Sequence, residues 1–339
     1  MIKDLRGNGA KWGKIADLLE IPEPTLRRWA HENGVVAKRE HVAPVFQHDT
    51  PVASEPTMDE LIQLARAAKK AKDGVDPILT HETITLDTDD TIAVIFVSCT
   101  HLGSRYVEHE SFALMLDAIL EVPGLYWVDL GDQVEGMEGF FDVASASEQS
   151  LADPQLQRKL LAHVLDKLVS ANKLLCGFAG QHGAQWARRK TGEDPIKQLY
   201  LERKIPYFDG QAYLTLQVGD QTYKLFAAHQ LPGHSIYNKH HAHRRASLFR
   251  APNADVIIQG DRHQGGVQWI TTDSWEPDMP ERQWFVQAGT AKTGADPYTI
   301  RTWKVGAWEF PILLFRPDRH DITQALDLSQ AQALLEGWE

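Results

Sequence analysis

The stretch TIAVIFVSCTHLG (residues 91–103) decides the fold class of this chain. Residues 92–98 are apolar or small, with no alternation of polar and apolar positions. This pattern is typical of a strand that is covered on both faces, by helices or by a second sheet. The strand is followed by Cys99 and His101, and in open α/β sheets ligands gather beyond the carboxyl ends of strands. A metal site is therefore one interpretation of this pair, and an incidental structural role is the other.

The composition bounds the class of protein. The chain has 339 residues, of which 43% are hydrophobic, enough for one large core and a small accessory domain. The formal net charge of −11 argues against a protein that coats nucleic acid, but it allows a local basic patch. No run approaches the ~18–20 apolar residues of a membrane span, and no secretory signal begins the chain, so we expect no membrane partner.

The two cysteines, Cys99 and Cys176, both lie in or just after apolar strand-like runs. Such a pair does not form a disulfide framework, and free thiols fit a reducing compartment. We therefore expect a cytoplasmic protein, in a bacterium or in a phage-infected host cell. The sequence does not predict its oligomeric state.

Residues 1–36 predict a small helical domain. One helix is expected over residues 11–20 and a second over residues 23–33, with a break at Pro22 and a C-terminal cap at Gly34. Apolar residues form one face of each helix: Trp12, Ile15, Ala16 and Leu19 on the first, Leu26, Trp29 and Ala30 on the second. The pattern resembles the helix-turn-helix domains of phage and transposon proteins, although Glu20 replaces the usual glycine of the turn.

That resemblance implies DNA as a partner of the N-terminal domain. The residues expected to contact DNA are Thr25, Arg27 and Arg28, on the second helix. The first 40 residues carry eight Lys or Arg and six Asp or Glu, so this part is slightly basic while the rest of the chain is acidic. The alternative is a helical hairpin that only packs against the main domain.

The composition and periodicity of the sequence divide the chain into four segments. After residues 1–36, residues 37–76 predict a linker and a helix with a basic end. Residues 77–318 alternate strands with helices and predict an α/β domain, and residues 319–339 predict a C-terminal helix. The strands expected to build the site are 92–98, 124–130, 174–179, 222–227 and 254–259.

Each of these five strands leads into a loop that contains potential metal ligands. In chain order the loops hold Cys99 and His101, then Gly131-Asp132, then Gly180-Gln181-His182, then His229, and finally Gly260-Asp261 with His263. A single loop of this kind is common by chance. Five such loops at successive strand ends predict one shared site.

The five loops resemble those of the calcineurin-like metallophosphoesterase family, which read Asp-x-His, Gly-Asp, Gly-Asn-His, His and Gly-His-x-His. The resemblance covers about residues 91–315. It implies an α/β (α+β) fold, a four-layer α/β/β/α sandwich of two mixed sheets flanked by helices. It also implies a dinuclear metal site whose ions activate water for attack on a phosphoester.

The resemblance assigns a role to each loop residue. One ion would bind Cys99, His101, Asp132 and His263, and the other Asp132, Gln181, His229 and Asp261, so that Asp132 bridges the two. His182 matches the histidine that assists the leaving oxygen, and with Asp132 it is the expected catalytic residue. Arg105, Arg188 and Arg262 are expected to contact the phosphate of the substrate.

Three ligand positions depart from the family pattern. Cys99 replaces aspartate, Gln181 replaces asparagine and Asp261 replaces histidine. All three side chains can coordinate metals, and a thiolate favours zinc or iron over manganese. Manganese, zinc or iron are the expected metals, two ions per chain.

The leading function is a metal-dependent phosphodiesterase or nuclease that acts on DNA, similar to phage-encoded relatives of the repair exonucleases. One alternative is a catalytically weakened or inactive protein of this fold that serves as a DNA-binding adaptor or regulator. A second alternative is a small-molecule phosphatase with an incidental helical hairpin.

Overall fold

The computed structural model describes residues 1–7, 10–35, 57–75, 79–136, 149–233, 235, 237–272, 280–293 and 308–337. The predicted linker, residues 37–57, falls almost entirely outside these ranges. The chain divides into two compact units, Met1–Ala68 and Lys69–Glu339. Each unit is described by itself below.

The N-terminal unit begins with three short helices, α1 (Ile2–Gly7), α2 (Trp12–Leu19) and α3 (Glu23–Glu32). Its core consists of Ile15, Ala16 and Leu26, with α1 packed against it through Ile2 and Leu5. The turn between α2 and α3 places Glu20 in the left-handed conformation (φ 53°), which explains why glycine is common at such a position. The two-helix pattern is confirmed, and α1 is an addition that the sequence did not predict.

One predicted core residue of this unit is exposed. Trp29 was expected beside Leu26 and Ala30, but 42% of its surface is accessible, whereas Leu26 and Ala30 are buried. The core of this unit is small, and Leu26 and Ala30 pack into it while the large indole of Trp29 stays partly in solvent. Helix α4 (Met58–Val75) follows, beginning at a capping box in which Glu60 accepts a hydrogen bond from the amide of Thr57.

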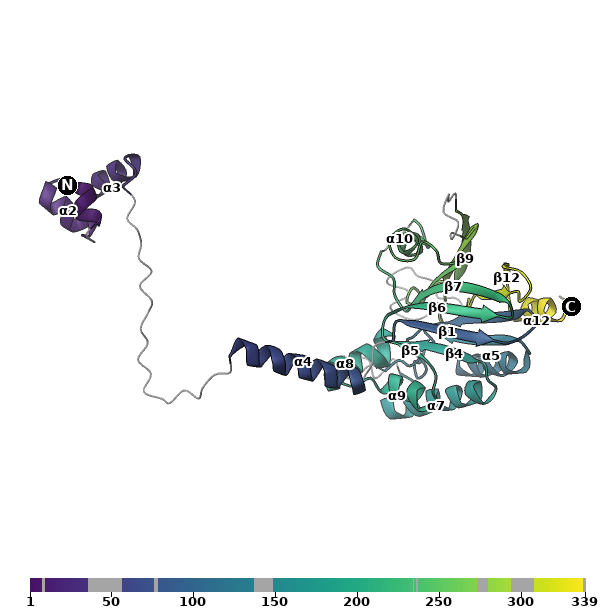
Figure 1. The fold of residues 1–339 in the computed structure, drawn as a ribbon. Helices are drawn as coiled ribbons and strands as arrows, with labels where there is room; N and C mark the ends of the chain where they lie inside the picture. The colour runs from purple at the N-terminus through teal and green to yellow at the C-terminus, as the bar shows by residue number, and fades with distance from the viewer. Residues whose placement is uncertain are drawn as a thin grey trace. The chain divides into compact units, whose positions relative to one another are not determined.

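The second unit contains two six-stranded mixed sheets (Figure 1). Sheet B has the order β12-β11-β2-β3-β4-β5, and its parallel strands β2 to β5 are joined by helices, as parallel pairing requires. Its strands are β2 (Ile92–Val97), β3 (Leu125–Asp129), β4 (Leu174–Phe178), β5 (Tyr207–Phe208), β11 (Ile312–Phe315) and β12 (Ile322–Ala325).

Sheet A has the order β1-β6-β7-β8-β10-β9. In it the hairpin β6–β7 pairs in parallel with β1 on one side and with β8 on the other. Its strands are β1 (His81–Leu86), β6 (Gln211–Val218), β7 (Gln221–Ala228), β8 (Val256–Gln259), β9 (Gly266–Thr271) and β10 (Arg282–Gln287).

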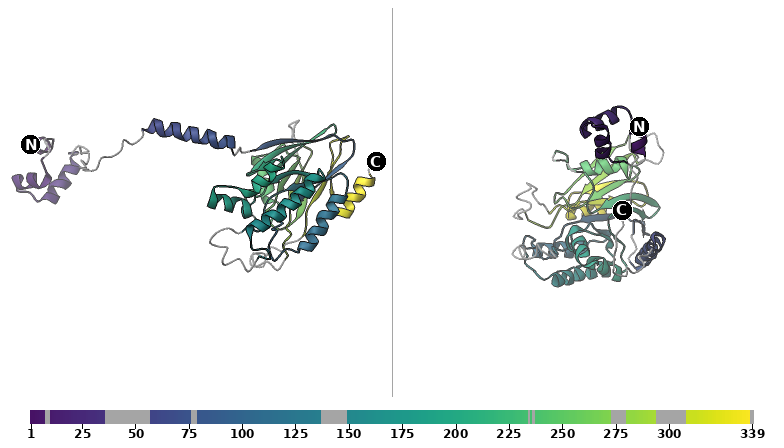
Figure 2. Two further views of the ribbon diagram at one scale, coloured as in Figure 1. Left: turned by 90° about the horizontal axis from the view of Figure 1, so that it is seen from below. Right: turned by 90° about the vertical axis from the view of Figure 1, so that its left-hand side faces the viewer.

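Helices cover the outer face of each sheet, so the unit has four layers (Figure 1, Figure 2). Helices α5 (His109–Glu121), α7 (Pro154–Ser170), α9 (Pro195–Glu202) and α12 (Leu328–Gly337) cover sheet B, and α10 (His241–Phe249) covers sheet A. Between the sheets lies an apolar layer that includes Phe96, Phe178, Leu225 and Ala227. The predicted α/β/β/α sandwich is confirmed.

Differences from the predicted elements lie mainly at the ends of the chain and at short strands. Strand β12 occupies Ile322–Ala325, so the C-terminal helix begins at Leu328, later than expected. Strands β5 and β9 and the short helix α8 (Trp186–Thr191) were not predicted, because none has a hydrophobic period long enough to recognise. Among the described residues, no helix has both the length and the apolar character needed to cross a membrane.

Candidate metal centre

The five predicted loops meet at one edge of the sandwich. They follow β2, β3 and β4 of sheet B and β7 and β8 of sheet A, all at the carboxyl ends of these strands. Backbone pairing continues beyond the strands, because the amide of Cys99 donates to Gly131 O (2.9 Å) and that of His101 donates to Asp132 O (3.0 Å). The first two loops are therefore locked in register with each other.

Six side chains from these loops form one cluster, here called the ligand cluster. Their ligand atoms form three overlapping groups, within each of which the atoms lie within 4.8 Å of one another: Cys99, His101 and His263; Cys99, Asp132 and His229; His101, Asp132 and His182. Cys99, His101 and Asp132 each belong to two groups, so the three groups are continuous. All six side chains except that of His182 are buried.

The distance between the Nε2 atoms of His101 and His263 is that expected of two nitrogens that bind the same metal ion. Nε2 of His101 lies 3.2 Å from Nε2 of His263. Two nitrogens that bind one tetrahedral zinc at ~2.0–2.1 Å lie about 3.3 Å apart. The pair is therefore already at the spacing that a bound ion would require.

His229 directs its Nε2 atom toward two carboxylates. Its Nδ1 donates a hydrogen bond to Leu130 O (2.7 Å), which leaves Nε2 to face Oδ2 of Asp132 at 3.2 Å and Oδ1 of Asp261 at 4.0 Å. Burial alone would lower the pKa of His229, but the carboxylates outweigh it and raise the pKa to about 9. A positive charge is therefore favoured at Nε2, either a proton or a metal ion.

Asp132 lies at the centre of this charge distribution. Burial would raise its pKa, but the imidazoles of His229, His182 and His101 hold it well below its ordinary value. Its Oδ1 accepts the backbone amide of His182 (2.8 Å) while Oδ2 faces His229. Asp132 is thus an ionised carboxylate whose two oxygens face different parts of the cluster, as a bridging ligand requires.

Cys99 is a thiol without a bound cation. Burial, together with the charge of Asp132, raises its pKa well above the ordinary value. Since a coordinated thiol is deprotonated by the ion it binds, metal binding at Cys99 would release a proton. The residues of the ligand cluster therefore fit a divalent metal in their spacing, their burial and their chemistry.

The backbone of these loops is unusual. The described residues include eight non-glycine residues with positive φ, and five of them are Cys99, His101, Asp132, Asp261 and His263. Such conformations cost of order 1–3 kcal/mol each and persist where the surrounding structure imposes them. Their concentration at the predicted ligands makes this edge the candidate functional site.

Two predicted ligands stand at the margin of the cluster. The amide of Gln181 donates to Oε1 of Gln230 (3.3 Å), and the amide of Gln230 donates to Oδ2 of Asp261 (3.0 Å). Gln181 and Asp261 are two of the three positions that depart from the family pattern, and Gln230, which was not predicted, connects them. Asp261 does not belong to the three groups of the ligand cluster.

His182 occupies the position expected of the residue beside the substrate. Its Nδ1 lies 2.8 Å from Glu135 O, and its ring lies beside that of Trp186 at a tilt of 42°, with centroids 4.2 Å apart. The carbonyl can only accept, so the proton of a neutral ring is on Nδ1 and Nε2 is left for the site.

The three predicted phosphate-binding arginines differ in their surroundings. Arg105 is exposed, with its guanidinium 5.7 Å from the ring of Tyr106. Arg262 lies 3.6 Å from Asp261 and donates to Gly233 O. Arg188 forms ion pairs with Asp194 and Asp209, and these pairs connect α8 to α9.

The residues predicted to contact DNA lie in the N-terminal unit. Thr25, Arg27 and Arg28 are all exposed, and Arg27 forms an ion pair with Glu23 one turn earlier on α3.

Two groups of buried polar residues behind the cluster were not predicted. The first is Glu135 with Lys292, which is taken up below. The second is Asp129, which accepts hydrogen bonds from Tyr200 (2.6 Å) and Gln133 (3.0 Å). Burial raises the pKa of Asp129 to about 6, although these hydrogen bonds oppose the shift.

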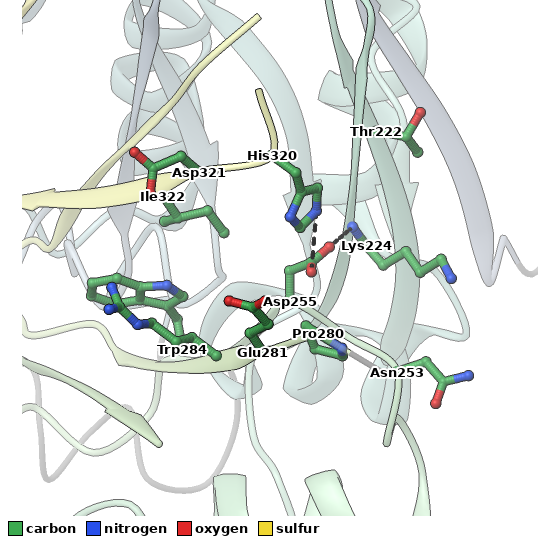
Figure 3. Close-up of a pocket in the computed structure, with 11 residues that line it drawn as sticks. Thr222, Lys224, Asn253, Asp255, Pro280, Glu281, Trp284, His320, Asp321 and Ile322 are labelled. Atoms are coloured by element: carbon green, nitrogen blue, oxygen red, sulfur yellow. Dashed lines mark hydrogen bonds and ion pairs between the residues drawn. The ribbon is translucent and has the colours of Figure 1, made fainter. Parts of the chain in front are cut away.

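The opposite end of sheet A carries a polar hollow of about 610 Å³ (Figure 3). It is lined by residues at the amino-terminal ends of β8 and β10 and by the segment before β12, among them Asp255, Trp284 and His320. Asp255 lies 3.3 Å from His320 and accepts the backbone amide of Lys224 (2.6 Å). These contacts join the two sheets and are distant in the topology from the ligand cluster.

No family model and no curated protein matches the chain. Solved structures with a similar arrangement include wild-type Vps29 complexed with zinc from Entamoeba histolytica, at 11% identity over 69% of this chain and 98% of that chain (TM-score 0.35). A putative 5'-nucleotidase from Staphylococcus aureus matches at 12% identity over 73% of this chain and 58% of that chain (TM-score 0.38). At such low scores, conclusions about function depend on the site itself.

Proposed function

We propose that this chain is a metal-dependent phosphoesterase, a divergent relative of the calcineurin-like metallophosphoesterases, that hydrolyses phosphodiester bonds in DNA. The observation that carries the proposal is the ligand cluster, in which six side chains from five strand-end loops converge. Thiolate, imidazole and carboxylate together suit zinc or iron better than magnesium or calcium. Bound divalent ions would supply an ionised water and neutralise charge on the phosphoryl oxygens.

The chain's own residues would orient this chemistry. Asp132 shares one group of ligand atoms with Cys99 and His229 and another with His101 and His182, so its carboxylate is placed to contribute to both. His182 is held by Glu135 O through Nδ1, so Nε2 would be the nitrogen that takes a proton from solvent and, in the imidazolium form, passes it to the leaving oxygen. This assignment gives His182 a role separate from that of the buried ligands.

DNA as the substrate is supported by the N-terminal unit. Its helix α3 exposes Thr25, Arg27 and Arg28 after a tight turn, as in helix-turn-helix domains. Because this unit is covalently joined to the second unit, DNA held there would be present at a raised local concentration near the ligand cluster.

An adaptor without catalytic turnover is the second candidate, and one observation favours it. Two of the predicted ligands make hydrogen bonds to a protein side chain, because the amide of Gln181 donates to Gln230 and Asp261 accepts from the amide of Gln230. A protein that binds one ion tightly but lacks the second would keep the fold and lose the activated water.

The first experiment measures metal content and hydrolysis together. Protein purified without chelator is analysed for zinc, iron and manganese, and then assayed with a bis-arylphosphate and with DNA. We expect two ions per chain and hydrolysis of both substrates. We expect the Asp132→Asn variant to lose the bound ions and the hydrolysis. Bound metal without turnover would favour the adaptor, and absence of bound metal under all conditions would contradict the proposal.

The second experiment tests DNA. Binding of the full chain to duplex and single-stranded DNA is measured at increasing salt for wild type, Arg28→Ala on α3 and Lys14→Ala on α2. We expect Arg28→Ala to weaken binding and reduce the salt dependence, while the exposed control Lys14→Ala changes binding less. Hydrolysis of arylphosphates without DNA retention at low salt would favour a small-molecule phosphatase instead.

A further inference from the structure

A buried ion pair lies directly behind the ligand cluster. Glu135 follows Asp132 in the loop after β3, and Lys292 lies in the loop after β10. Nζ of Lys292 is 3.1 Å from Oε1 and 3.0 Å from Oε2 of Glu135. Both residues are at most 5% exposed, so the pair is excluded from water.

The same carboxylate contacts a ring nitrogen of the cluster. Oε2 of Glu135 lies 2.9 Å from Nδ1 of His101, an ion-pair distance whose angles are outside those of a hydrogen bond, and the other nitrogen of His101, Nε2, lies 3.2 Å from Nε2 of His263. A neutral imidazole carries its proton on only one nitrogen, and a carboxylate beside Nδ1 favours the proton there. Nε2 then presents its lone pair to the cluster, which is the form that binds a metal ion.

Lys292 makes this arrangement possible. A carboxylate buried without a partner would take up a proton or be expelled, because desolvation of an unpaired charge costs several kcal/mol. The ammonium group lies against both oxygens of the Glu135 carboxylate and limits where that carboxylate can lie. Since the pair is neutral as a whole, it orients His101 without adding net charge to the site.

The loop that carries Lys292 is hydrogen-bonded to the loop that carries Cys99 and His101. The hydroxyl of Thr290 and the amide of Ala291 both donate to Cys99 O, at 2.8 and 3.1 Å. The amide of Thr293 donates to Tyr106 O (2.7 Å). The position of the ammonium group is therefore tied by backbone contacts to Cys99 and His101.

We propose that Glu135 and Lys292 are positioning residues that hold His101 in the tautomer and orientation required for metal binding. The proposal rests on the metal-binding part of the proposed function and is independent of DNA as the substrate. A pair that only stabilised the fold would affect unfolding but leave the affinity of the folded protein for metal unchanged. This difference separates the two roles.

The test compares zinc affinity in Glu135→Gln, Lys292→Met and the double variant with wild type, by competition with a chromophoric chelator. Loss of an outer partner of a metal-binding histidine weakens affinity by about 10–100-fold, which is the range we expect for Glu135→Gln. The double variant should regain thermal stability relative to the single variants without regaining affinity. Cobalt substitution adds a second readout, since a changed His101 orientation alters the visible spectrum of the bound ion.

Lys173→Met is the matched control. Lys173 is also buried, but its ammonium donates to Val122 O and Leu125 O near the amino-terminal end of β3, away from the cluster. It should lose stability and keep wild-type zinc affinity. If Glu135→Gln does not fold, Glu135→Asp keeps the charge but withdraws it from His101, and the same weakening is expected.

The outcomes separate the two proposals. If wild type binds zinc and the folded Glu135 and Lys292 variants bind it equally well with unchanged cobalt spectra, the positioning role is wrong. If wild type itself binds neither zinc nor cobalt, the proposed function fails at its metal site.

Discussion

The α-carbon of Gly180 lies so close to Asp132 that a Cβ there would be 2.1 Å from the amide nitrogen of Asp132 and 2.2 Å from its Oδ1. No side-chain rotation relieves such a contact, because backbone atoms form half of it. The loop after β4 can therefore approach the central carboxylate only with glycine at this position.

Gly180→Ala should displace Asp132 and with it the amide of His182 that its carboxylate accepts. We expect loss of bound metal and a destabilisation of about 1–3 kcal/mol, the usual cost of overpacking. Metal analysis and thermal unfolding measure the two effects. Gly210→Ala is the control, since a Cβ there meets no atom within 4 Å, and an equal loss in both variants would contradict the explanation.

Cys99→Asp should shift the metal preference of the site. A carboxylate oxygen is a harder ligand than a thiolate, so manganese should gain affinity relative to zinc. We expect the ratio of the two affinities to change by at least about tenfold, or about 1.4 kcal/mol. Titration of the metal-free protein with each ion measures the ratio, and an unchanged ratio would mean that Cys99 does not bind metal.

Asp129 should make the stability of the metal-free protein depend on pH. Its pKa is raised to about 6 by burial, so between about pH 4 and pH 6 the folded protein holds a proton that the unfolded chain has released. Stability therefore falls as pH rises through this window, by up to about 3 kcal/mol. Urea unfolding of wild type and Asp129→Asn at several pH values tests this: the stability of wild type relative to the variant should decline over the window.

His320 should make stability depend on pH in the same direction but in a higher pH range (Figure 3). Its contact with Asp255 raises its pKa above the ordinary value, so its contribution is present below about pH 6.5 and is lost as pH rises through the folded pKa. Nearly half of its side chain is exposed, so the effect should stay below about 1 kcal/mol. His320→Gln should lower the melting temperature at about pH 5.5 and have no effect near pH 9. Equal effects at both would contradict this account.

The sequence predicted the site better than its surroundings. Cys99, His101, Asp132, His182, His229 and His263 could be grouped from sequence because each follows a recognisable strand, and parallel strands bring their carboxyl ends together. Glu135 lies three residues after Asp132 and might have been singled out as a carboxylate within the same loop. Lys292 could not, because only tertiary structure brings the loop after β10 beside His101.

The core of the N-terminal unit was predicted less well. Trp29 has the helical spacing of a core residue, but the number of side chains that a three-helix core admits does not follow from that spacing. The assignment of Gln181 as a ligand stays a prediction. The contact of its amide with Gln230 could not be predicted, because Gln230 is distant in sequence and belongs to no motif.

The left-handed backbone at five predicted ligands has a consequence for how such a site can change. The direction in which each side chain leaves its loop is set by main-chain conformation, which the glycines and the paired loops maintain. The chemical identity of the ligand is then a separate variable. A lineage can exchange aspartate for cysteine, or histidine for aspartate, and obtain a different metal preference from the same scaffold, one residue at a time.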